Sequence, residues 1–381
     1  MDFLAVLGRQ PEISLAELEA LFSDVKQVSK NLAIFSAPEN FNFSRLGGSL
    51  KIAVKLPKTP LDFLKTVENR KIVFGLSDYS PSVSTKSITL EALKLKKILV
   101  RFGHSVRVVE NKTPVLSTAT SLHNGLSGKN LHKFEFIKYR ESWFKVVHIQ
   151  DIDAYANRDQ ARPARDARVG MLPPKLAQIL INLCGPLKEN SLILDPFCGT
   201  GVVPQEALLM GYSAYGTDIN ERMVEYSRRN LEFLQSEKFR SATAREETCE
   251  QRDPRMEKFQ VSPGDATNYK WNKEINAVAC ESYLGKPFSN IPTEIELKEQ
   301  KQECSSIILG FLKNLSSQIK TGTPVVVAIP AWLREDNYSR LDILDLIAEM
   351  GYNVNNKSRE GLLYHREGQI VARDIIILRK N

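Results

Sequence analysis

The C-terminal half of the chain alternates between short apolar runs and longer amphipathic runs, starting after Pro173-Pro174. Where a helix connects two such strands, the strands lie parallel in one sheet and the helix covers a face of that sheet. The alternation therefore predicts a Rossmann-like α/β domain with a mostly parallel sheet over residues 171–381. The predicted strands are 191–195, 213–218, 258–263, 275–280 and 323–329, and the predicted helices are 174–183, 202–210, 220–235, 296–319 and 340–350.

The end of the chain and two polar segments depart from this alternation. Residues 361–378 contain two β-runs joined near Glu367-Gly368, which predicts a terminal β-hairpin beside the sheet. Residues 236–257 are polar and predict an insertion or a mobile loop. Residues 151–170 are dense in arginine and aspartate, with no net charge and a poor helix signal, so they form either a linker or a functional loop.

The first 150 residues mix strands and helices without a strict order. A strand at 2–8, a helix starting after Ser14 and strands at 31–37 and 50–56 predict a small α+β domain over residues 1–57. Ser14 and Glu17 have the spacing of a capping box, which places the start of that helix. A second domain over residues 58–150 is predicted from helices at 61–68, 88–102 and 117–126 and strands at 71–75, 104–109, 134–139 and 143–149.

Positive charge is concentrated in one part of the chain. Residues 51–150 contain 18 Lys or Arg against 7 Asp or Glu, whereas the rest of the chain contains 34 against 38. A basic segment of domain length beside a near-neutral remainder suggests a surface that binds a polyanion such as RNA. A solvated lysine-rich surface without a ligand explains the same composition, and charge alone does not separate the two.

The remaining bulk features place the protein in a reducing, cytoplasmic compartment. The N-terminus has the pattern of a first β-strand rather than a signal peptide, and no apolar run has the length of a membrane span. The five cysteines are widely spaced, which predicts neither a disulfide framework nor a zinc site.

The segment Leu192-Ile-Leu-Asp195-Pro-Phe-Cys-Gly-Thr-Gly201 joins a buried strand to a helix through a glycine turn. Gly199 and Gly201 remove side chains where the backbone passes close to a ligand. A dinucleotide site requires a third glycine, and the carboxylate of Asp195 would repel a diphosphate. Asp195 is suited instead to a cationic ligand, such as the amino group of S-adenosylmethionine.

Two more acidic residues follow the next two strands. Asp218 ends the strand after the glycine turn, where a carboxylate can bond both hydroxyls of a ribose or cap the following helix. Asp265 follows the third strand, where it can accept a bond from an adenine amino group. Carboxyl ends of parallel strands share one edge of the sheet, so these acids predict one cofactor site. Its predicted residues are Asp195, Pro196, Phe197, Cys198, Gly199, Gly201, Asp218, Ile219, Asp265 and Ala266.

The fourth strand ends in Cys280-Glu-Ser-Tyr-Leu-Gly285. Methyltransferases that modify exocyclic amines usually carry Asp/Asn-Pro-Pro-Tyr/Phe here, with the acid accepting bonds from the amine and the ring stacking on the base. Without a gap the acid position falls on Cys280, whereas a one-residue deletion places Glu281 there. A neutral thiol is a poor acceptor, so we assign Glu281 and Tyr283 as the catalytic pair. A diverged strand end without catalysis is the alternative.

These motifs together resemble those of THUMP-domain S-adenosylmethionine-dependent RNA methyltransferases, the tRNA guanosine-N2 methyltransferase-like group. The resemblance includes the cofactor loop after Asp195 and extends over nearly the whole chain. Residues 7–19 and 45–53 resemble the family's N-terminal ferredoxin-like domain, and residues 162–177 resemble the segment that leads into the methyltransferase domain. The terminal hairpin is also typical of methyltransferases and not of dehydrogenases.

The resemblance implies a division of labour along the chain. It implies a ferredoxin-like domain at 1–57, a THUMP-like RNA-binding domain at 58–150, a linker at 151–170 and a methyltransferase domain at 171–381. The THUMP-like domain would hold the tRNA acceptor end, and a methyl group would pass from S-adenosylmethionine to guanine N2. No metal is required, since the sulfonium is already an activated leaving group. Some relatives use a small activating protein partner, and the sequence leaves that requirement open.

Two other functions fit parts of the same pattern. A DNA amino-methyltransferase uses the same cofactor loop and fourth-strand position, but normally carries a separate target-recognition domain. An RNA-binding protein that keeps the fold and has lost catalysis would explain the altered motif at Glu281. The modified nucleotide, the number of methyl groups added and the oligomeric state are not encoded in any motif of the chain.

Overall fold

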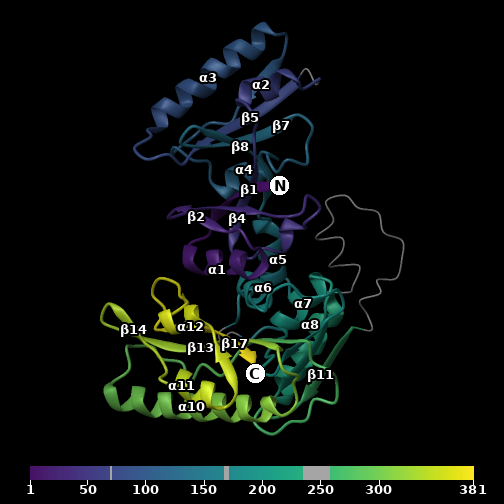
Figure 1. The fold of residues 1–381 in the computed structure, drawn as a ribbon, viewed down its shortest axis with the longest axis vertical. Helices are drawn as coiled ribbons and strands as arrows, with labels where there is room; N and C mark the ends of the chain where they lie inside the picture. The colour runs from purple at the N-terminus through teal and green to yellow at the C-terminus, as the bar shows by residue number, and fades with distance from the viewer. Residues whose placement is uncertain (69–70, 167–170, 235–257) are drawn as a thin grey trace. The chain divides into compact units, whose positions relative to one another are not determined.

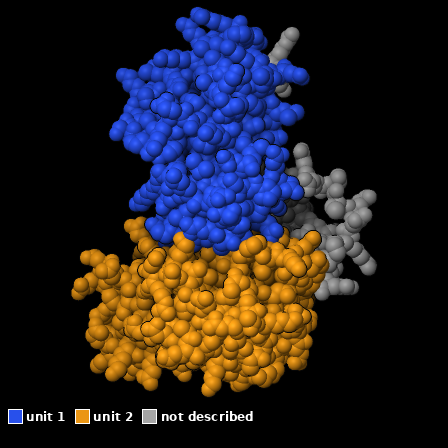
Figure 2. Space-filling view, viewed as in Figure 1, with its two compact units in different colours: residues 1–153 blue, residues 154–381 orange. Residues whose placement is uncertain are grey.

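The computed structural model describes residues 1–68, 71–166, 171–234 and 258–381. The polar stretch predicted as an insertion at 236–257 lies outside the described residues. The chain divides into two compact units, residues 1–153 and residues 154–381 (Figure 2). Among the described residues, no helix combines the length and the apolar character that crossing a membrane requires.

The N-terminal unit is built on one eight-stranded sheet with the order β2-β3-β1-β4-β8-β7-β5-β6 (Figure 1). β5 pairs in parallel with β6 and β7, and the other neighbours pair antiparallel. The strands are β1 (Asp2–Leu7), β2 (Lys26–Ser29), β3 (Leu32–Ser36), β4 (Ser49–Lys55), β5 (Lys71–Asp78), β6 (Ser105–Val108), β7 (Lys133–Tyr139) and β8 (Ser142–Ile149).

Helices cover both faces of this sheet. The helices are α1 (Pro11–Leu21), α2 (Pro60–Lys65), α3 (Thr85–Arg101) and α4 (Thr118–His123), with a short 3-10 turn at Phe43–Arg45. Successive residues of β5 point to opposite faces of the sheet, as in any β-strand. Ile72 and Phe74 pack in a core cluster with α3, and Val73 packs in a second cluster on the other face. Antiparallel pairing of β4 with β8 continues the sheet from residues 1–57 into residues 58–150. The assignment of these two parts as ferredoxin-like and THUMP-like stays a prediction.

The expected capping box at Ser14 is wrong. Helix α1 already begins at Pro11, whose fixed φ suits the first turn of a helix. The Ser14 hydroxyl donates to the Gly48 carbonyl at 2.8 Å, and the Glu17 carboxylate accepts the backbone N–H groups of Gly47 and Gly48 at 2.9 and 2.8 Å. The two residues therefore anchor the turn before β4, because that turn offers N–H groups that are buried and need acceptors.

A buried ion pair connects the two halves of the N-terminal sheet. Lys51 of β4 donates from Nζ to Glu135 of β7 at 2.6 Å, and both side chains are almost fully excluded from solvent. Lys51 also donates to the Leu116 carbonyl and the Ser121 hydroxyl, while Ser77 donates to the same Glu135 oxygen. The charges are thus compensated inside the unit, and they tie β4 to α4 and β7.

The C-terminal unit confirms the Rossmann-like prediction. Its sheet has the order β11-β10-β9-β12-β13-β17-β15, with β14 and β16 paired at β13 and β17. β9 to β13 are parallel, and β17 is antiparallel between β13 and β15. The strands are β9 (Leu192–Asp195), β10 (Ser213–Asp218), β11 (Phe259–Pro263), β12 (Ala277–Glu281), β13 (Pro324–Arg334), β14 (Asn337–Ser339), β15 (Tyr352–Val354), β16 (Leu363–Tyr364) and β17 (Val371–Lys380).

Five helices of the C-terminal unit follow the predicted positions: α6 (Pro174–Leu183), α7 (Val202–Leu209), α8 (Glu221–Leu234), α10 (Glu294–Ser316) and α11 (Leu344–Glu349). Helix α12 (Asn356–Glu360) was not predicted. The additional helix α5 (Ile152–Gln160) lies in the connector whose helix signal was poor. The expected terminal hairpin is present as the antiparallel pair β16 and β17, although most of β17 pairs with β13.

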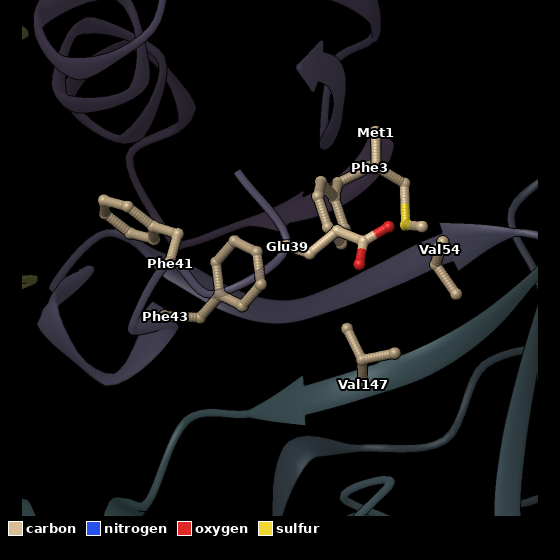
Figure 3. A pocket seen from close by; sticks show the side chains of 7 residues that line it. All are labelled: Met1, Phe3, Glu39, Phe41, Phe43, Val54 and Val147. Carbon is tan, nitrogen blue, oxygen red and sulfur yellow. The ribbon is translucent and has the colours of Figure 1, made fainter. Parts of the chain in front are cut away.

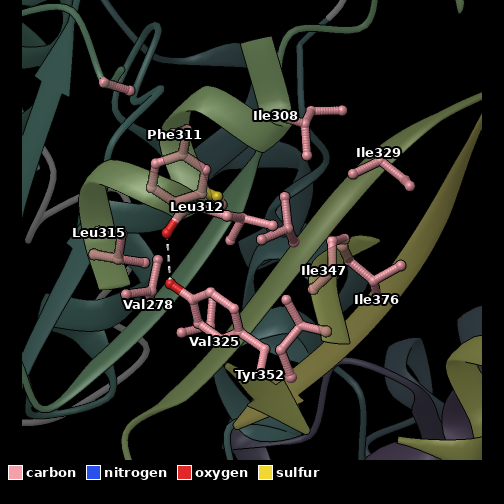
Figure 4. Close-up of a cluster of buried hydrophobic side chains, with 14 of the residues drawn as sticks. Val278, Ile308, Phe311, Leu312, Leu315, Val325, Ile329, Ile347, Tyr352 and Ile376 are labelled. Atoms are coloured by element: carbon pink, nitrogen blue, oxygen red, sulfur yellow. Dashed lines mark hydrogen bonds between the residues drawn. The ribbon is translucent and has the colours of Figure 1, made fainter. Parts of the chain in front are cut away.

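The largest side chains of this unit pack between the sheet and α10 (Figure 4). Val278, Val325 and Ile376 contribute from neighbouring strands, and Phe311 and Leu315 contribute from α10. Tyr352 is 1% exposed, and its hydroxyl donates to the Leu312 carbonyl at 2.8 Å. The aromatic ring is therefore buried without leaving its polar atom unpaired.

Replacing Lys51 with Met should lower the free energy of unfolding by about 3–5 kcal/mol, because Glu135 would keep a buried charge without a partner. Removing both charges, as Lys51→Met with Glu135→Leu, should restore a large part of that loss. Denaturant unfolding of the full chain, with amide hydrogen exchange of β7 as the local probe, measures both. Lys320→Met, which removes an exposed pair with Glu274, should change stability by less than about 1 kcal/mol. Equal effects of Lys51→Met and Lys320→Met would contradict the expected role of the buried pair.

Candidate active site

The predicted acidic residues lie at the carboxyl ends of neighbouring strands. β9 is hydrogen-bonded between β10 and β12, with Asp195 opposite Gly216 and Leu194 opposite Val278. Asp195, Asp218 and Glu281 each end one of these three strands. The parallel direction of the strands therefore brings the three carboxylates to one edge of the sheet.

Asp195 is the most deeply buried of the three, with 3% of its surface exposed. Its Oδ1 accepts the backbone N–H of Phe197 at 3.2 Å. Burial raises the pKa of Asp195 well above its ordinary value, and the nearby carboxylates of Asp218 and Glu281 raise it further. A buried acid beside two other acids favours a cation as its ligand.

Asp218 holds the glycine turn in place. Its two oxygens accept the backbone N–H groups of Gly199 and Asn220, each at 2.9 Å. Burial raises its pKa, and these two N–H bonds oppose the rise. The capping function considered for Asp218 belongs instead to Asn220, whose Oδ1 accepts the N–H of Arg222 in the first turn of α8 at 3.0 Å. Each oxygen of Asp218 keeps a second lone pair for a ligand. Ile219 follows with 74% of its side chain exposed, an unusual exposure for a large apolar residue.

Glycine is required at the two positions of the turn for different structural reasons. Both have positive φ, 49° at Gly199 and 83° at Gly201, which favours glycine. A Cβ at Gly199 would meet no atom closer than 4.0 Å, so the space beside it is open. A Cβ at Gly201 would lie 2.3 Å from the Ser227 hydroxyl of α8. Gly201 therefore makes room for α8, and the role of Gly199 in making room for a ligand stays a prediction.

The other residues of the turn are packed rather than exposed. Pro196 and Cys198 are buried, and the Cys198 N–H donates to the Thr217 carbonyl at 2.9 Å. The ring of Phe197 contacts Phe311 edge to face at 5.2 Å. These contacts fix the path of the backbone from β9 into α7.

Asp265 and Ala266 follow β11 on the far side of β10. Asp265 Oδ1 accepts the N–H and the hydroxyl of Thr267 at 2.9 and 2.8 Å. Ala266 is buried, and its carbonyl accepts from Asn314 of α10 at 3.0 Å. Asp265 thus orders the turn after β11, at the same sheet edge as the other acids.

Glu281 forms an ion pair that the sequence did not predict. Arg373 of β17 donates from Nε to Glu281 Oε1 at 2.7 Å, and the two side chains are 7% and 14% exposed. Burial raises the pKa of Glu281, and Arg373 lowers it. Cys280, the alternative acid position, is fully buried in the core against α10. Because successive residues of a strand point to opposite faces, only Glu281 of the two faces away from that core.

Tyr283 lies two residues after Glu281 and remains partly exposed. Burial raises the pKa of its hydroxyl, and the carboxylate of Glu303 raises it further. Tyr283 and Phe288 pack at the border of the core cluster around α10. Ser282 between the two predicted catalytic residues is buried, and its N–H and hydroxyl both donate to the Ala328 carbonyl, at 2.9 and 3.2 Å.

The segment before α6 packs on the helices that follow the glycine turn. Arg158 donates to Glu206 of α7 at 2.8 Å, and Arg222 of α8 donates to Asp166 at 2.6 Å. The Asn230 amide bonds both backbone groups of Ala164 and also donates to the Thr200 carbonyl at 2.9 Å. No local motif marks these contacts in the sequence, since each joins residues at least 30 positions apart.

A separate hollow of about 340 Å³ lies in the N-terminal unit (Figure 3). It is lined by apolar and aromatic side chains and one carboxylate: Met1, Phe3, Glu39, Phe41, Phe43, Val54 and Val147. None of the predicted site residues lines it. The chemistry-bearing groups are therefore at the sheet edge, and this hollow is not their site.

The residues at the sheet edge fit S-adenosylmethionine in charge and shape. Its amino group and sulfonium are cations, and Asp195, Asp218 and Glu281 form an acidic cluster to which Arg373 is bonded. The open space at Gly199 and the exposed Ile219 offer room and an apolar surface beside that cluster. This edge thus suits a cationic nucleoside better than a diphosphate.

Comparison with known proteins assigns the domain. Residues 162–281 match the family model described as UPF0020, RMKL-like, methyltransferase domain. The chain is 28% identical over 303 residues to a protein of Pyrococcus abyssi named tRNA (guanine(10)-N2)-dimethyltransferase, covering 77% of each chain. A protein of the same name from Methanothermobacter thermautotrophicus is 29% identical over 46% of this chain and 44% of its own.

Among solved structures, TrmN from Thermus thermophilus aligns with the whole chain at 15% identity and a TM-score of 0.48.

Asp195→Asn should weaken S-adenosylmethionine binding by roughly ten-fold or more, because a bond to an ionised group contributes about 1.5–3 kcal/mol. For the unchanged protein, affinity should fall as the pH drops through the raised pKa of Asp195, since a cation must then displace a proton. Calorimetric titrations between pH 5 and pH 8 would measure both effects. Glu189→Gln, which removes an exposed acid, should leave affinity unchanged. A pH dependence as steep in Asp195→Asn as in the unchanged protein would contradict this assignment.

The glycine turn, the acids of neighbouring strands and the family match all concern the same stretch of chain. The strand order with antiparallel β17 completes the predicted fold around them. The chain therefore carries an S-adenosylmethionine-dependent methyltransferase domain, whose residues 162–281 match the RMKL-like UPF0020 model.

Proposed function

We propose that this protein transfers a methyl group from S-adenosylmethionine to the N2 amine of guanine in tRNA. The observation that carries the proposal is the position of Glu281, a carboxylate at the end of β12 beside the cofactor loop. Tyr283 follows two residues later, one fewer than in the Asp/Asn-Pro-Pro-Tyr/Phe motif of methyltransferases of exocyclic amines. The relatives named tRNA (guanine(10)-N2)-dimethyltransferases support the same amine in the same class of RNA.

In this proposal the cofactor lies along the carboxyl edge from β12 to β11. Asp195, with the turn Pro196–Gly201 and the open space at Gly199, holds the methionine part. Asp218 bonds the ribose with its remaining lone pairs, and Ile219 covers one face of the adenine. Asp265 and Ala266 border the adenine amino group. Each assignment places a polar group of the cofactor against an acceptor that is already fixed by backbone N–H bonds.

The chemistry needs little more than orientation. S-adenosylmethionine supplies a methyl group that is already activated on a sulfonium. Glu281 accepts an N–H bond from the guanine amine, which directs the nitrogen lone pair toward that methyl group. Tyr283 stacks on the base and limits its rotation. Holding two reactants in line in this way accounts for a large part of the lowering of a reaction barrier.

RNA binding is assigned to the basic segment 51–150. The exposed side of α3 carries Lys94, Lys97 and Arg101, for which no ion pair is found among the described residues. Unpaired cations on one helix provide the counterion release that drives binding to phosphates. A cytoplasmic location belongs to the same proposal, because Cys184, Cys198, Cys280 and Cys304 are free thiols.

The direct test is a methylation assay with labelled S-adenosylmethionine on unmodified tRNA and on duplex DNA. Mass spectrometry of the digested nucleosides should show N2-methylated guanosine in the tRNA and no product in the DNA. Methylated DNA would favour the DNA enzyme. Cofactor and tRNA binding without product would favour an RNA-binding protein that has lost catalysis.

Glu281→Ala should reduce methyl transfer by at least about 100-fold and leave the cofactor affinity within about three-fold, since Glu281 acts on the amine. Turnover is measured under saturating cofactor, and affinity by calorimetry. Glu349→Ala, which removes an exposed acid of α11 outside the proposed mechanism, serves as the control. Unchanged turnover in Glu281→Ala would remove Glu281 from the catalytic pair.

Replacing Lys94, Lys97 and Arg101 together with Ala should weaken tRNA binding and lower the slope of log affinity against log salt by about one for each phosphate that is no longer neutralised. Filter binding at several salt concentrations gives both quantities. A matched triple variant removes three exposed lysines of the C-terminal unit, Lys188, Lys298 and Lys313. Equal slopes for the two triple variants would contradict binding through α3.

A further inference from the structure

Arg373 reaches Glu281 across an intervening strand. In the sheet, Glu281 of β12 is opposite Ala328 of β13, and Ala328 is opposite Ile375 of β17. Paired residues of neighbouring strands point to the same face, and residues two positions apart on one strand do so too. Arg373 therefore shares a face with Glu281, and its side chain spans β13 to bond Oε1 at 2.7 Å.

The bond compensates for a feature that the usual motif supplies and this chain lacks. In Asp/Asn-Pro-Pro-Tyr/Phe, the prolines fix the backbone next to a short acid. Here the acid is a glutamate, which has one more rotatable bond, and Ser282 follows it. A longer side chain without a fixed position would lose conformational entropy each time it bonded a substrate. The ion pair removes that freedom before substrate arrives.

We propose that Arg373 is a positioning residue for methyl transfer, holding Oε1 of Glu281 so that Oε2 is directed to the target amine. This inference rests on the proposed function, because it assigns Arg373 a role in orienting the same acid. The guanidinium has a planar set of donors, of which Nε is committed to Glu281. It acts through Glu281 and need not contact the methyl group.

The charges around Glu281 make the same arginine important for its ionisation. The carboxylate of Glu281 lies close enough to Asp195 of β9 to raise the pKa of Asp195. The carboxylate of Asp218 of β10 raises the pKa of Asp195 as well. The thiol of Cys280 is buried beside these acids, and its pKa is raised well above its ordinary value. Arg373 is the cation that lowers the pKa of Glu281. Without Arg373, Glu281 would take up a proton more readily, because other carboxylates lie nearby, and a protonated Glu281 would lose an acceptor oxygen.

A neighbouring ion pair on the same strand provides the contrast. Asp374, the next residue of β17, points to the opposite face and accepts from Arg340 Nε at 2.6 Å. Arg340 also donates to the carbonyls of Ser358 and Arg359, so it fastens the end of α12 to the sheet. Buried ion pairs are a weak source of net stability. The Arg340 pair has a structural purpose in those carbonyl bonds, whereas Arg373 is bonded to the predicted catalytic acid.

The test compares Arg373→Met and Arg373→Lys with Arg340→Met in the full-length protein, using tRNA and S-adenosylmethionine. Arg373→Met should lower kcat by about 100-fold, the order expected from misplacing a reacting group, with cofactor affinity nearly unchanged. Because activity needs ionised Glu281, the acid limb of its pH–rate profile should move to higher pH. Arg373→Lys should return the acid limb toward its original position, with kcat between the two. Arg340→Met should lower thermal stability without moving the profile.

A double variant keeps the test decisive if the single change harms folding. When Glu281 is already Gln, adding Arg373→Met should have little further effect on kcat, because the arginine acts only through that acid. Independent, multiplying losses would overturn the proposal. So would equal losses in Arg373→Met and Arg340→Met with an unmoved pH profile, which indicate a structural role. Absence of tRNA methylation by the unchanged protein would instead refute the proposed function, so the two failures are distinguishable.

Discussion

The carboxylates of Asp195, Asp218 and Glu281 share one edge of the C-terminal sheet, and their charge constrains everything built around them. Burial raises the pKa of each, because removing a carboxylate from water disfavours its ionised form. Backbone N–H groups from the glycine turn and the guanidinium of Arg373 offset part of this cost. A cationic cofactor offsets more of it. An edge with these charges favours a cationic ligand such as a sulfonium over a phosphate.

The N-terminal unit also buries charged side chains, but there a carboxylate is paired with a lysine. Lys51 and Glu135 are buried as a compensated pair, and their partners come from β4, β7, α4 and the segments between them. This pair has no open side for a ligand, so it stabilises one continuous sheet from residues 1–57 into residues 58–150. Positive charge that could contact RNA lies on the surface of this unit, for example at the exposed Lys86, Lys94 and Lys97 of α3. The N-terminal unit thus pairs its buried carboxylate with a buried lysine, whereas the C-terminal unit gathers carboxylates at one edge of its sheet.

Much of this organisation could be predicted, and the errors have physical reasons. Alternating strands and helices predicted the parallel sheet, because a period of two or of 3.6 is a local property of the sequence. The capping box at Ser14 was wrong because the same hydroxyl and carboxylate can bond any buried N–H or carbonyl, and the turn at Gly47-Gly48 offered them. Helix α5 was missed because its stability comes from contacts such as Arg158 with Glu206, far along the chain.

By itself the sequence determined the fold class, the cofactor turn and the acids that end the strands of the sheet, since these depend on residue type and short spacing. Only the tertiary structure shows that the pleat buries Cys280 in the core and turns Glu281 away from it. It alone revealed Arg373, which lies 92 residues from Glu281 and reaches it across β13. Strand order brings these two residues together, and strand order depends on how the whole sheet assembles rather than on any local pattern.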